Sequence, residues 1–266
     1  MTKERKALKE RKAEGEFYTP KWLVAAAERM IARNLGESWK DEYVIWDCAW
    51  GGGALTSFGG FREAYCSTLN QEDIDSNDCS GVTAFQYDFL EDGIGADGLN
   101  EEVILNDSKM PDGLKEVLLS KKKLLFLINP PYFSGGCMFQ GKNKSLLDFK
   151  VNKVFNKVKE YKSALSRSYG CFMIRVLEYL KINPNISMGL FCTPIFLSGP
   201  SFDNFRSRFL GDFKYLDGAL FPSNVFSDCS SLWGVTFNLW TPGVTEDKKN
   251  FPHLLLGGEE DVEKYL

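Results

Sequence analysis

The sequence contains almost no histidine: His253, beside Pro252, is the single one among 266 residues. A Ser-His-Asp triad, a Cys-His pair and a multi-histidine metal site each need a histidine at the reacting centre. A lone histidine near the end of the sequence argues against all three kinds of site, and we predict no metal centre.

Paired cysteines and long apolar runs are missing as well. The seven cysteines are odd in number, form no Cys-x-x-Cys pair and fall mostly inside short apolar runs, which predicts reduced thiols in a core. No run approaches the roughly 18 apolar residues that a membrane span needs, and the charged amino-terminal stretch has no apolar segment behind it. We therefore expect a cytoplasmic protein without a signal peptide, a membrane anchor or a membrane partner.

The charge balance is slightly acidic, with 32 Lys and Arg against 36 Asp and Glu, so the chain is not a uniformly basic nucleic-acid coat. Residues 142–167 depart from this balance, with eight basic side chains and two acidic ones. The basic set is Lys142, Lys144, Lys150, Lys153, Lys157, Lys159, Lys162 and Arg167. Two interpretations remain open, a solvated helix face and a surface that faces phosphates.

Apolar residues make up 44% of the chain, enough for the core of an α/β domain. Thr19 is the expected N-cap of a helix over 20–35, with Pro20 as its first residue. Strands that alternate with amphipathic helices predict a mostly parallel sheet covered on both faces. The predicted strands are 43–47, 64–69, 82–88, 124–128, 186–193, 215–221 and 233–240, and the later helices are 112–123, 167–181 and 200–210.

Three glycines, Gly51, Gly52 and Gly53, follow the first predicted strand. Glycine permits positive φ and lets a ligand approach the backbone, and open α/β sheets bind nucleotides at this place. Thr56 stands where a dinucleotide fingerprint has its third glycine, which disfavours a nicotinamide cofactor. The alternative is a tight turn without a ligand.

Carboxylates follow the next two predicted strands. Glu72 and Asp73 come after the second strand, where a carboxylate usually holds ribose hydroxyls. Asp88 and Phe89 come after the third strand and offer an acceptor for an exocyclic amine and an aromatic face for a ring. Taken singly, each is more typical of an ordinary strand-end residue.

The most specific motif is Asn129, Pro130, Pro131 and Tyr132, directly after the predicted strand 124–128. Neither proline has an N–H, and Pro131 restricts Pro130 to an extended conformation, so the Asn129 amide and the Pro130 carbonyl should point outward without local partners. Two such acceptors suit a planar amine: by taking both N–H hydrogens they localise its lone pair and make the nitrogen nucleophilic. A proline turn that only closes a strand would not need the asparagine and the tyrosine together.

In this order the motifs resemble the gamma arrangement of the S-adenosylmethionine-dependent DNA adenine-N6 methyltransferases, the NPPY amino-methyltransferases of restriction-modification type. The resemblance runs from Glu16 to about Trp240. Residues 15–20 look like the family's amino-terminal cofactor motif, and residues 47–53 like its D-P-A-C-G-x-G motif, with Cys48 for the proline and Trp50 for the cysteine. The resemblance implies a class I methyltransferase fold, with a seven-stranded, mostly parallel sheet and helices on both faces.

The same resemblance implies roles for individual residues. Contacts to S-adenosylmethionine would come from Phe17, Tyr18, Thr19, Pro20, Asp47, Ala49, Gly51 and Gly53, with Glu72 or Asp73 on its ribose and Asp88 and Phe89 on its adenine. The target amine would be held by Asn129, Pro130, Pro131 and Tyr132, with Tyr132 stacking on the flipped base. A second aromatic clamp is expected from Phe221 or Phe226, and we favour Phe226.

The implied partners are double-stranded DNA and a specificity subunit or restriction endonuclease, because the family's gamma arrangement continues into a target-recognition domain. We expect a helical segment at 1–40, the catalytic domain at 41–245, and at 246–266 a tail or the start of a target-recognition region.

Three alternatives remain open. The Asn-Pro-Pro-Tyr device would serve a glutamine amide of a protein or a base of RNA, although the Phe-Tyr-Thr-Pro stretch favours DNA. The third is a non-catalytic nucleic-acid-binding module that keeps the fold but, through Trp50, has lost the cofactor. A cytosine C5 methyltransferase is disfavoured because it needs a cysteine nucleophile, typically after proline, and the sequence has no Pro-Cys pair.

Overall fold

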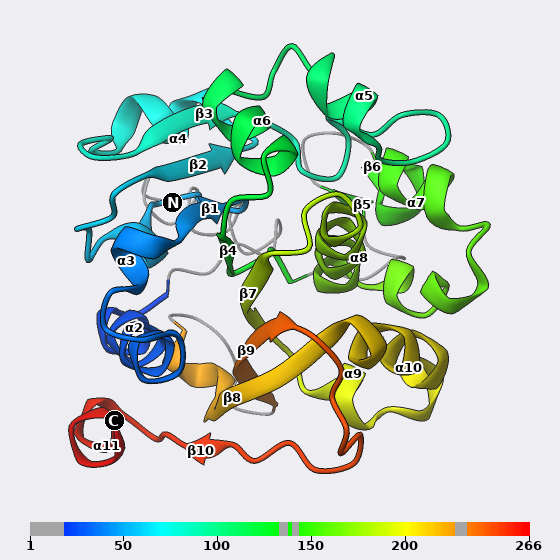
Figure 1. Cartoon of the computed structure of the whole chain (residues 1–266). Coiled ribbons are helices and arrows are strands. Elements are labelled where there is room, and N and C mark those ends of the chain that lie inside the picture. The colour runs from blue at the N-terminus through cyan, green and yellow to red at the C-terminus, as the bar shows by residue number, and fades with distance from the viewer. Residues whose placement is uncertain (1–18, 133–137, 140–143, 227–232) are drawn as a thin grey trace, which may run out of the picture.

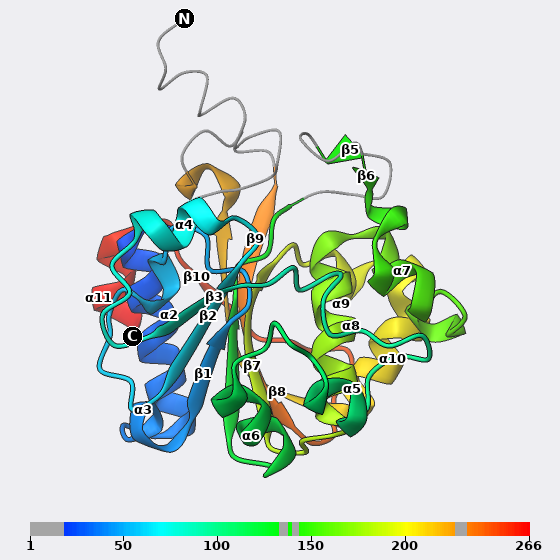
Figure 2. The same ribbon diagram turned by 90° about the horizontal axis from the view of Figure 1, so that it is seen from above.

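The computed structural model describes residues 19–132, 138–139, 144–226 and 233–266. One eight-stranded sheet runs through the middle of the molecule, with helices on both of its faces (Figures 1 and 2). In space the strands follow the order β10, β8, β9, β7, β4, β1, β2, β3. Their bounds are β1 (Val44–Asp47), β2 (Ala64–Thr68), β3 (Thr83–Gln86), β4 (Leu124–Ile128), β7 (Ile186–Cys192), β8 (Phe213–Pro222), β9 (Gly234–Pro242) and β10 (Leu254–Leu255).

The sheet has one strand more than the seven predicted, and one of its strands runs antiparallel to its neighbours. All seven predicted runs form strands, and β10 adds a short eighth strand that pairs parallel to β8. Two residues are too few to show a pattern in the sequence, so β10 escaped prediction. Among these eight strands β9 alone runs against the others, antiparallel to both β7 and β8, so the sheet is mixed. A separate pair, β5 (Met138–Phe139) and β6 (Lys144–Ser145), forms a small antiparallel ladder.

Alternate residues of the central strands feed two cores, one on each side of the sheet. Trp46 and Phe126 belong to one core, whereas their neighbours Ile45 and Leu125 belong to the other. Because successive side chains of a strand point to opposite faces, a strand buried on both faces reads as a continuous apolar run. This is why the run at 124–128 predicted the bounds of β4 correctly.

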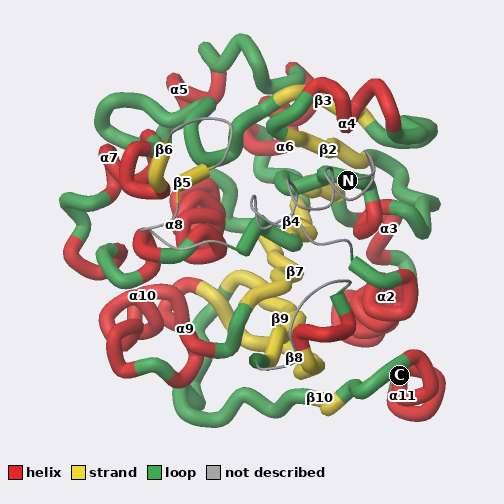
Figure 3. The backbone as a smooth tube through the Cα atoms, turned by 180° about the vertical axis from the view of Figure 1, so that it is seen from behind, coloured by secondary structure: helices red, strands yellow, loops and turns green. Residues whose placement is uncertain are grey.

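Helices cover both cores. In Figure 2, α2, α3 and α11 lie on one side of the sheet and α6, α8 and α10 on the other, and Figure 3 shows the strands as a band between these groups. The segments predicted as helices at 112–123, 167–181 and 200–210 form α6, α8 and α10. The helices are α2 (Lys21–Leu35), α3 (Trp39–Glu42), α4 (Gln71–Ser76), α5 (Glu101–Leu105), α6 (Asp112–Leu119), α7 (Lys150–Phe155), α8 (Ser168–Leu180), α9 (Ile195–Ser198), α10 (Asp203–Asp212) and α11 (Glu259–Tyr265).

The start of α2 corrects one expectation. The helix begins at Lys21 with Pro20 as its N-cap, and the Pro20 carbonyl accepts the N–H groups of Leu23 and Val24 at 3.0 and 3.1 Å. The Thr19 hydroxyl makes no capping hydrogen bond to this helix, because its buried side chain is bonded instead to a residue after β4.

Residues 246–266, predicted to be a tail or the start of a further region, form β10 and α11 and complete the sheet. Val262 of α11 is buried in the core beneath α2, and its carbonyl accepts a hydrogen bond from Arg29 Nη1 at 3.2 Å. Within the ranges described, no helix is both long and apolar enough to cross a membrane.

The parallel strands end at one edge of the sheet, which we call the carboxyl edge. Strand β9 begins there because it runs in the opposite direction. The segments that follow β1, β2, β3, β4 and β8 therefore meet along this edge, and they are the segments that carry the predicted site residues.

Candidate active site

The turn after β1, residues 47–53, forms a bend that requires glycine, and we call it the glycine bend. Gly51 has φ +48° and Gly53 has φ +72°, a region that other residues enter only with strain. A Cβ added to Gly51 would meet only the Ala49 carbonyl oxygen, at 3.9 Å, among the described atoms. The described residues therefore leave the backbone at Gly51 open to a ligand.

Asp47, the last residue of β1, holds a buried carboxyl group. It is 1% exposed, and its Oδ1 accepts the Ala49 N–H at 3.1 Å. Burial disfavours the ionised form and raises the pKa of Asp47 to about 7, against the opposing effect of this one hydrogen bond. A cationic ligand at the bend would restore the charge of this carboxylate.

Within the glycine bend, the side chain of Trp50 packs against Gly53 and supports the turn. Its indole Nε1 donates to the Thr56 hydroxyl at 2.9 Å, in the short 3-10 helix Ala54–Thr56 that follows the bend. A Cβ on Gly53 would lie 3.3 Å from the same indole nitrogen, so the tryptophan and the glycine fit each other closely. The residue that departs from the family's motif is thus part of the buried support of the turn.

The acidic residues after β2 lie in the first turn of α4, next to the bend. Asp73 Oδ2 accepts a hydrogen bond from the Thr68 hydroxyl at 2.5 Å, whereas Glu72 is exposed. Asn77, just after α4, donates from Nδ2 to the Gly51 carbonyl at 2.8 Å and so ties this helix to the bend.

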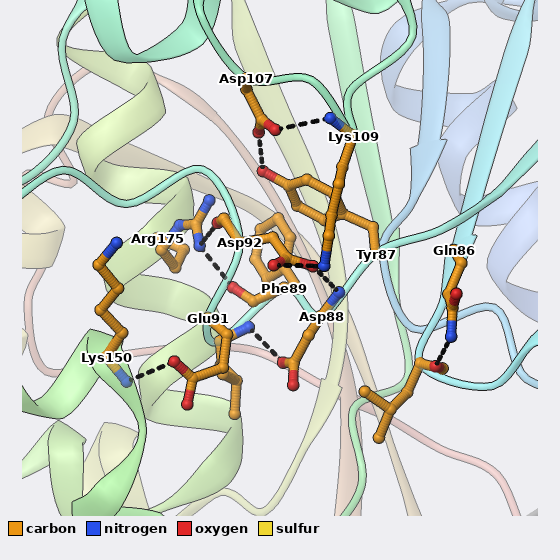
Figure 4. A network of polar contacts seen from close by, with 12 residues as sticks. Gln86, Tyr87, Asp88, Phe89, Glu91, Asp92, Asp107, Lys109, Lys150 and Arg175 are labelled. Carbon is orange, nitrogen blue, oxygen red and sulfur yellow. Dashed lines mark hydrogen bonds and ion pairs between the residues drawn. The ribbon is translucent and has the colours of Figure 1, made fainter.

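Asp88 and Phe89, which follow β3, differ in their surroundings: Asp88 bonds to the turn, whereas Phe89 is buried in the core (Figure 4). Asp88 Oδ1 accepts the Leu90 N–H at 3.0 Å, and its own N–H donates to Asp92 Oδ2 at 2.8 Å. Phe89 is 3% exposed and stacks on Phe172 with a centroid distance of 5.1 Å. The ring of Phe89 therefore packs in the core, and its contact with the adenine of a cofactor stays a prediction.

The Asn-Pro-Pro-Tyr turn is tied to the molecule on two sides. Asn129 Nδ2 donates to Thr19 Oγ1 at 2.8 Å, and the Pro131 carbonyl accepts a hydrogen bond from the hydroxyl of Ser168, the first residue of α8. The Asn129 amide nitrogen thus has a partner that is distant in sequence, because the segment before α2 reaches the end of β4. The structure thereby brings the amino-terminal motif and the Asn-Pro-Pro-Tyr motif into contact.

Aromatic rings surround Tyr132. Phe226 lies 6.3 Å and Trp233 5.8 Å from it between ring centroids, and Phe221 lies behind Phe226 at 6.0 Å. Both phenylalanines are buried, and Phe226 rather than Phe221 reaches Tyr132. Sequence reasoning missed Trp233, since no periodic pattern reveals that β9 starts at the carboxyl edge.

Residues 150–151 of the basic segment lie beside the turn after β3. The N–H of Val151 donates to the Leu90 carbonyl at 3.0 Å, and the N–H of Lys150 to Glu91 Oε2 at 3.3 Å. Lys153, Lys157, Lys159 and Lys162 are exposed, and Lys150 and Arg167 are partly buried. Phe17, Tyr18 and Lys142 lie outside the described residues. Within the described chain no group of three or more His, Cys, Asp or Glu side chains could hold a metal ion.

No protein-family model matches the chain, and no curated protein matches it. Its fold matches solved structures. DrdV in a complex with DNA has a TM-score of 0.60 at 17% identity, over 96% of this chain and 30% of that one. The methyltransferase subunit of a type I restriction-modification system from Streptococcus thermophilus has a TM-score of 0.55 at 14% identity, over 94% and 51%. The type IIG restriction endonuclease BpuSI has a TM-score of 0.50 at 16% identity, over 86% and 26%.

The chain shares its fold with a restriction-modification methyltransferase subunit. It spans about half of that subunit and less than a third of the other two proteins. At these identities the likeness shows a common α/β fold with a mixed sheet, and the chemistry has to be argued from the site.

Proposed function

We propose that the chain is an S-adenosylmethionine-dependent methyltransferase that transfers a methyl group to N6 of adenine in double-stranded DNA, as a catalytic subunit or segment of a restriction-modification system. One observation carries the proposal: the Asn-Pro-Pro-Tyr turn shares the carboxyl edge with the glycine bend, and Tyr132 there lies beside Phe226 and Trp233. The common fold with a restriction-modification methyltransferase subunit supports it.

The residues along the carboxyl edge suit the chemical groups of S-adenosylmethionine. The open glycine bend and the buried carboxyl of Asp47 suit its cationic end, Glu72 or Asp73 its ribose hydroxyls, and the Asp88 carboxylate its adenine amine. When bound, the cofactor supplies an electrophilic methyl group on a sulfonium sulfur.

The target amine would be held by the oxygen of the Asn129 amide and the Pro130 carbonyl. Asn129 Nδ2 donates to Thr19, so the amide oxygen is the atom of this side chain that would accept from the amine. Accepting both hydrogens localises the nitrogen lone pair for direct transfer without a covalent enzyme intermediate. Tyr132 stacks on the base that has left the duplex, with Phe226 as the second aromatic residue.

Incubation with methyl-labelled cofactor and genomic DNA, followed by nucleoside analysis, tests the proposal. We expect label in N6-methyldeoxyadenosine. Label found instead in RNA added in parallel, or in glutamine of an added protein extract, would reject DNA as the substrate. Calorimetry with folded protein and millimolar S-adenosylmethionine separates the remaining alternative, because a non-catalytic module that lost its cofactor gives no heat of binding.

A further inference from the structure

Arg175 of α8 is a fully buried cation whose guanidinium grips the turn at residues 88–92 (Figure 4). Its Nη1 donates to the carbonyl oxygens of Phe89 at 2.6 Å and of Asp92 at 2.9 Å. Its Nη2 donates to the Tyr179 hydroxyl, one helical turn further along α8, at 2.8 Å. A single side chain therefore fixes two carbonyls of this turn to a rigid helix.

The charge of Arg175 is balanced by dipoles and rings. In the described chain no carboxylate forms an ion pair with it, and its Cζ lies 4.7 Å from the ring centroid of Phe89 and 5.2 Å from that of Tyr179. Burying a cation without a carboxylate is costly, and an apolar side chain of similar volume would fill the space at lower cost. What the guanidinium adds is a rigid, planar fork of donors: Nη1 holds the two carbonyls while Nη2 bonds Tyr179 and fixes the plane of the group.

The solvent side of the same turn is fixed by a second set of bonds. Asp92 accepts the N–H of Asp88 at 2.8 Å and pairs with Lys109 Nζ, which lies 2.8 and 2.9 Å from its two oxygens. Asp107 in turn accepts the N–H of Lys109 at 3.0 Å and the hydroxyl of Tyr87 at 2.8 Å. The backbone on both sides of Asp88 is thus held from the core and from the surface.

We propose that Arg175 is a positioning residue: by holding the Phe89 and Asp92 carbonyls it presents the Asp88 carboxylate to the exocyclic amine of the cofactor's adenine. This inference rests on the proposed function, and it adds the residue that makes recognition of the adenine amine selective. Asp88 can read an amine only if its carboxylate keeps one orientation, since a mobile carboxylate would hydrogen-bond to water at little loss.

Two probes test this role by binding alone. S-adenosylhomocysteine carries the adenine amine, and S-inosylhomocysteine carries an oxo group in its place. A carboxylate that accepts from the amine is left facing the oxo oxygen, so we expect the wild-type protein to prefer the adenosine compound by about tenfold or more in calorimetry. In Arg175→Lys the fork is lost, and the preference should fall to within about threefold of unity.

A matched control is available in Arg206, whose Nη1 also donates to two backbone carbonyls, those of Phe196 and Gly199, away from this turn. Arg206→Lys should leave the preference unchanged, whatever it does to stability. Asp92→Ala provides a second test of the preference between the two probes. It removes the surface-side acceptor of the Asp88 N–H and leaves the core unchanged. It should lower the preference in the same direction.

The outcomes separate this inference from the proposed function. A preference that survives in both Arg175→Lys and Asp92→Ala overturns the positioning role and leaves the methyltransferase proposal standing. Equal binding of the two probes by the wild-type protein also overturns it, because Asp88 then does not read the amine. If the wild-type protein binds neither probe, the proposed function fails and this inference fails with it.

Discussion

The hydroxyl of Thr19 accepts a hydrogen bond from the side-chain amide of Asn129, at 2.8 Å, across 110 residues of sequence. The bond joins the segment that leads into α2 to the turn that follows β4. It also sets the orientation of an amide whose oxygen, in the proposed mechanism, has to face the target amine.

Loss of this bond should slow methyl transfer. In Thr19→Val the amide can turn about its last torsion, and one neutral hydrogen bond of about 1 kcal/mol corresponds to a rate lower by about five- to tenfold. Thr19→Ser keeps the hydroxyl and should retain most of the rate. Single-turnover rates with saturating cofactor make the comparison, and equal rates for the valine and serine variants would contradict the orienting role.

Removal of the Asn129 amide should abolish transfer to adenine-containing duplexes while S-adenosylhomocysteine still binds. Asn129→Ala removes an acceptor for the reacting amine, an effect on the order of 100-fold or more where such acceptors stabilise the transition state. Asn204→Ala, at an exposed asparagine of α10, serves as the control and should keep full activity. Undiminished transfer by Asn129→Ala would remove this residue from the mechanism.

The indole of Trp50 and the hydroxyl of Thr56 should be energetically coupled, because they form a buried hydrogen bond at 2.9 Å. Urea denaturation of Trp50→Phe, Thr56→Val and the double variant closes a double-mutant cycle, for which we expect about 1 kcal/mol of coupling. The Trp50→Phe variant should also bind S-adenosylhomocysteine more weakly, since the glycine bend loses its brace. Additive effects in the cycle would show that the two side chains act independently.

Asp47 should make stability depend on pH. Its pKa is raised to about 7 by burial, whereas the unfolded chain titrates near 4, so between these values the folded state binds the extra proton. Stability contributed by the neutral form is present at low pH and is lost as pH rises through this window. The free energy of unfolding of Asp47→Asn, relative to wild type, should therefore rise by roughly 3 kcal/mol between pH 5 and pH 8. A constant difference across this range would place the titration of Asp47 elsewhere.

Two exposed lysines, Lys153 in α7 and Lys157 just after it, should contact DNA phosphates. Lys153→Glu combined with Lys157→Glu should reduce the slope of log K against log salt by about 2, at about 0.9 for each phosphate contact. The control is the same reversal at Lys248 and Lys249, which follow the end of β9 at the opposite edge of the sheet. An equal slope for both double variants would assign the basic segment to a solvated helix face.

Sequence patterns located the strands well because strands buried on both faces leave a strong signal. The runs that form β4 and β7 are mostly apolar and buried along their whole length, and both were predicted to within one residue. Parallel strands then had to end at one edge, so the glycine bend, Asp88 and Asn129 could be assigned to it in advance. The two residues of β10 and the reversed direction of β9 leave no such pattern.

Side-chain directions at strand ends were beyond prediction. Phe89 was expected to face a ligand, but the turn bound by Arg175 directs its ring into the core. Thr19 was expected to cap α2, but its hydroxyl accepts from the side-chain amide of Asn129, a partner 110 residues away that local spacing does not reveal. Local rules specify which residues can bond, whereas long-range packing decides which of them do.

Helix α11 is bonded to α2, because the Arg29 side chain of α2 donates a hydrogen bond to the Val262 carbonyl of α11. Helix α2 begins two residues after Thr19, so α11 packs against the helix that follows the hydroxyl bonded to Asn129. Deletion of α11 would remove one packing partner of α2. We therefore expect it to loosen the position of Thr19 and, through the hydrogen bond, the hold of Asn129 on the reacting base.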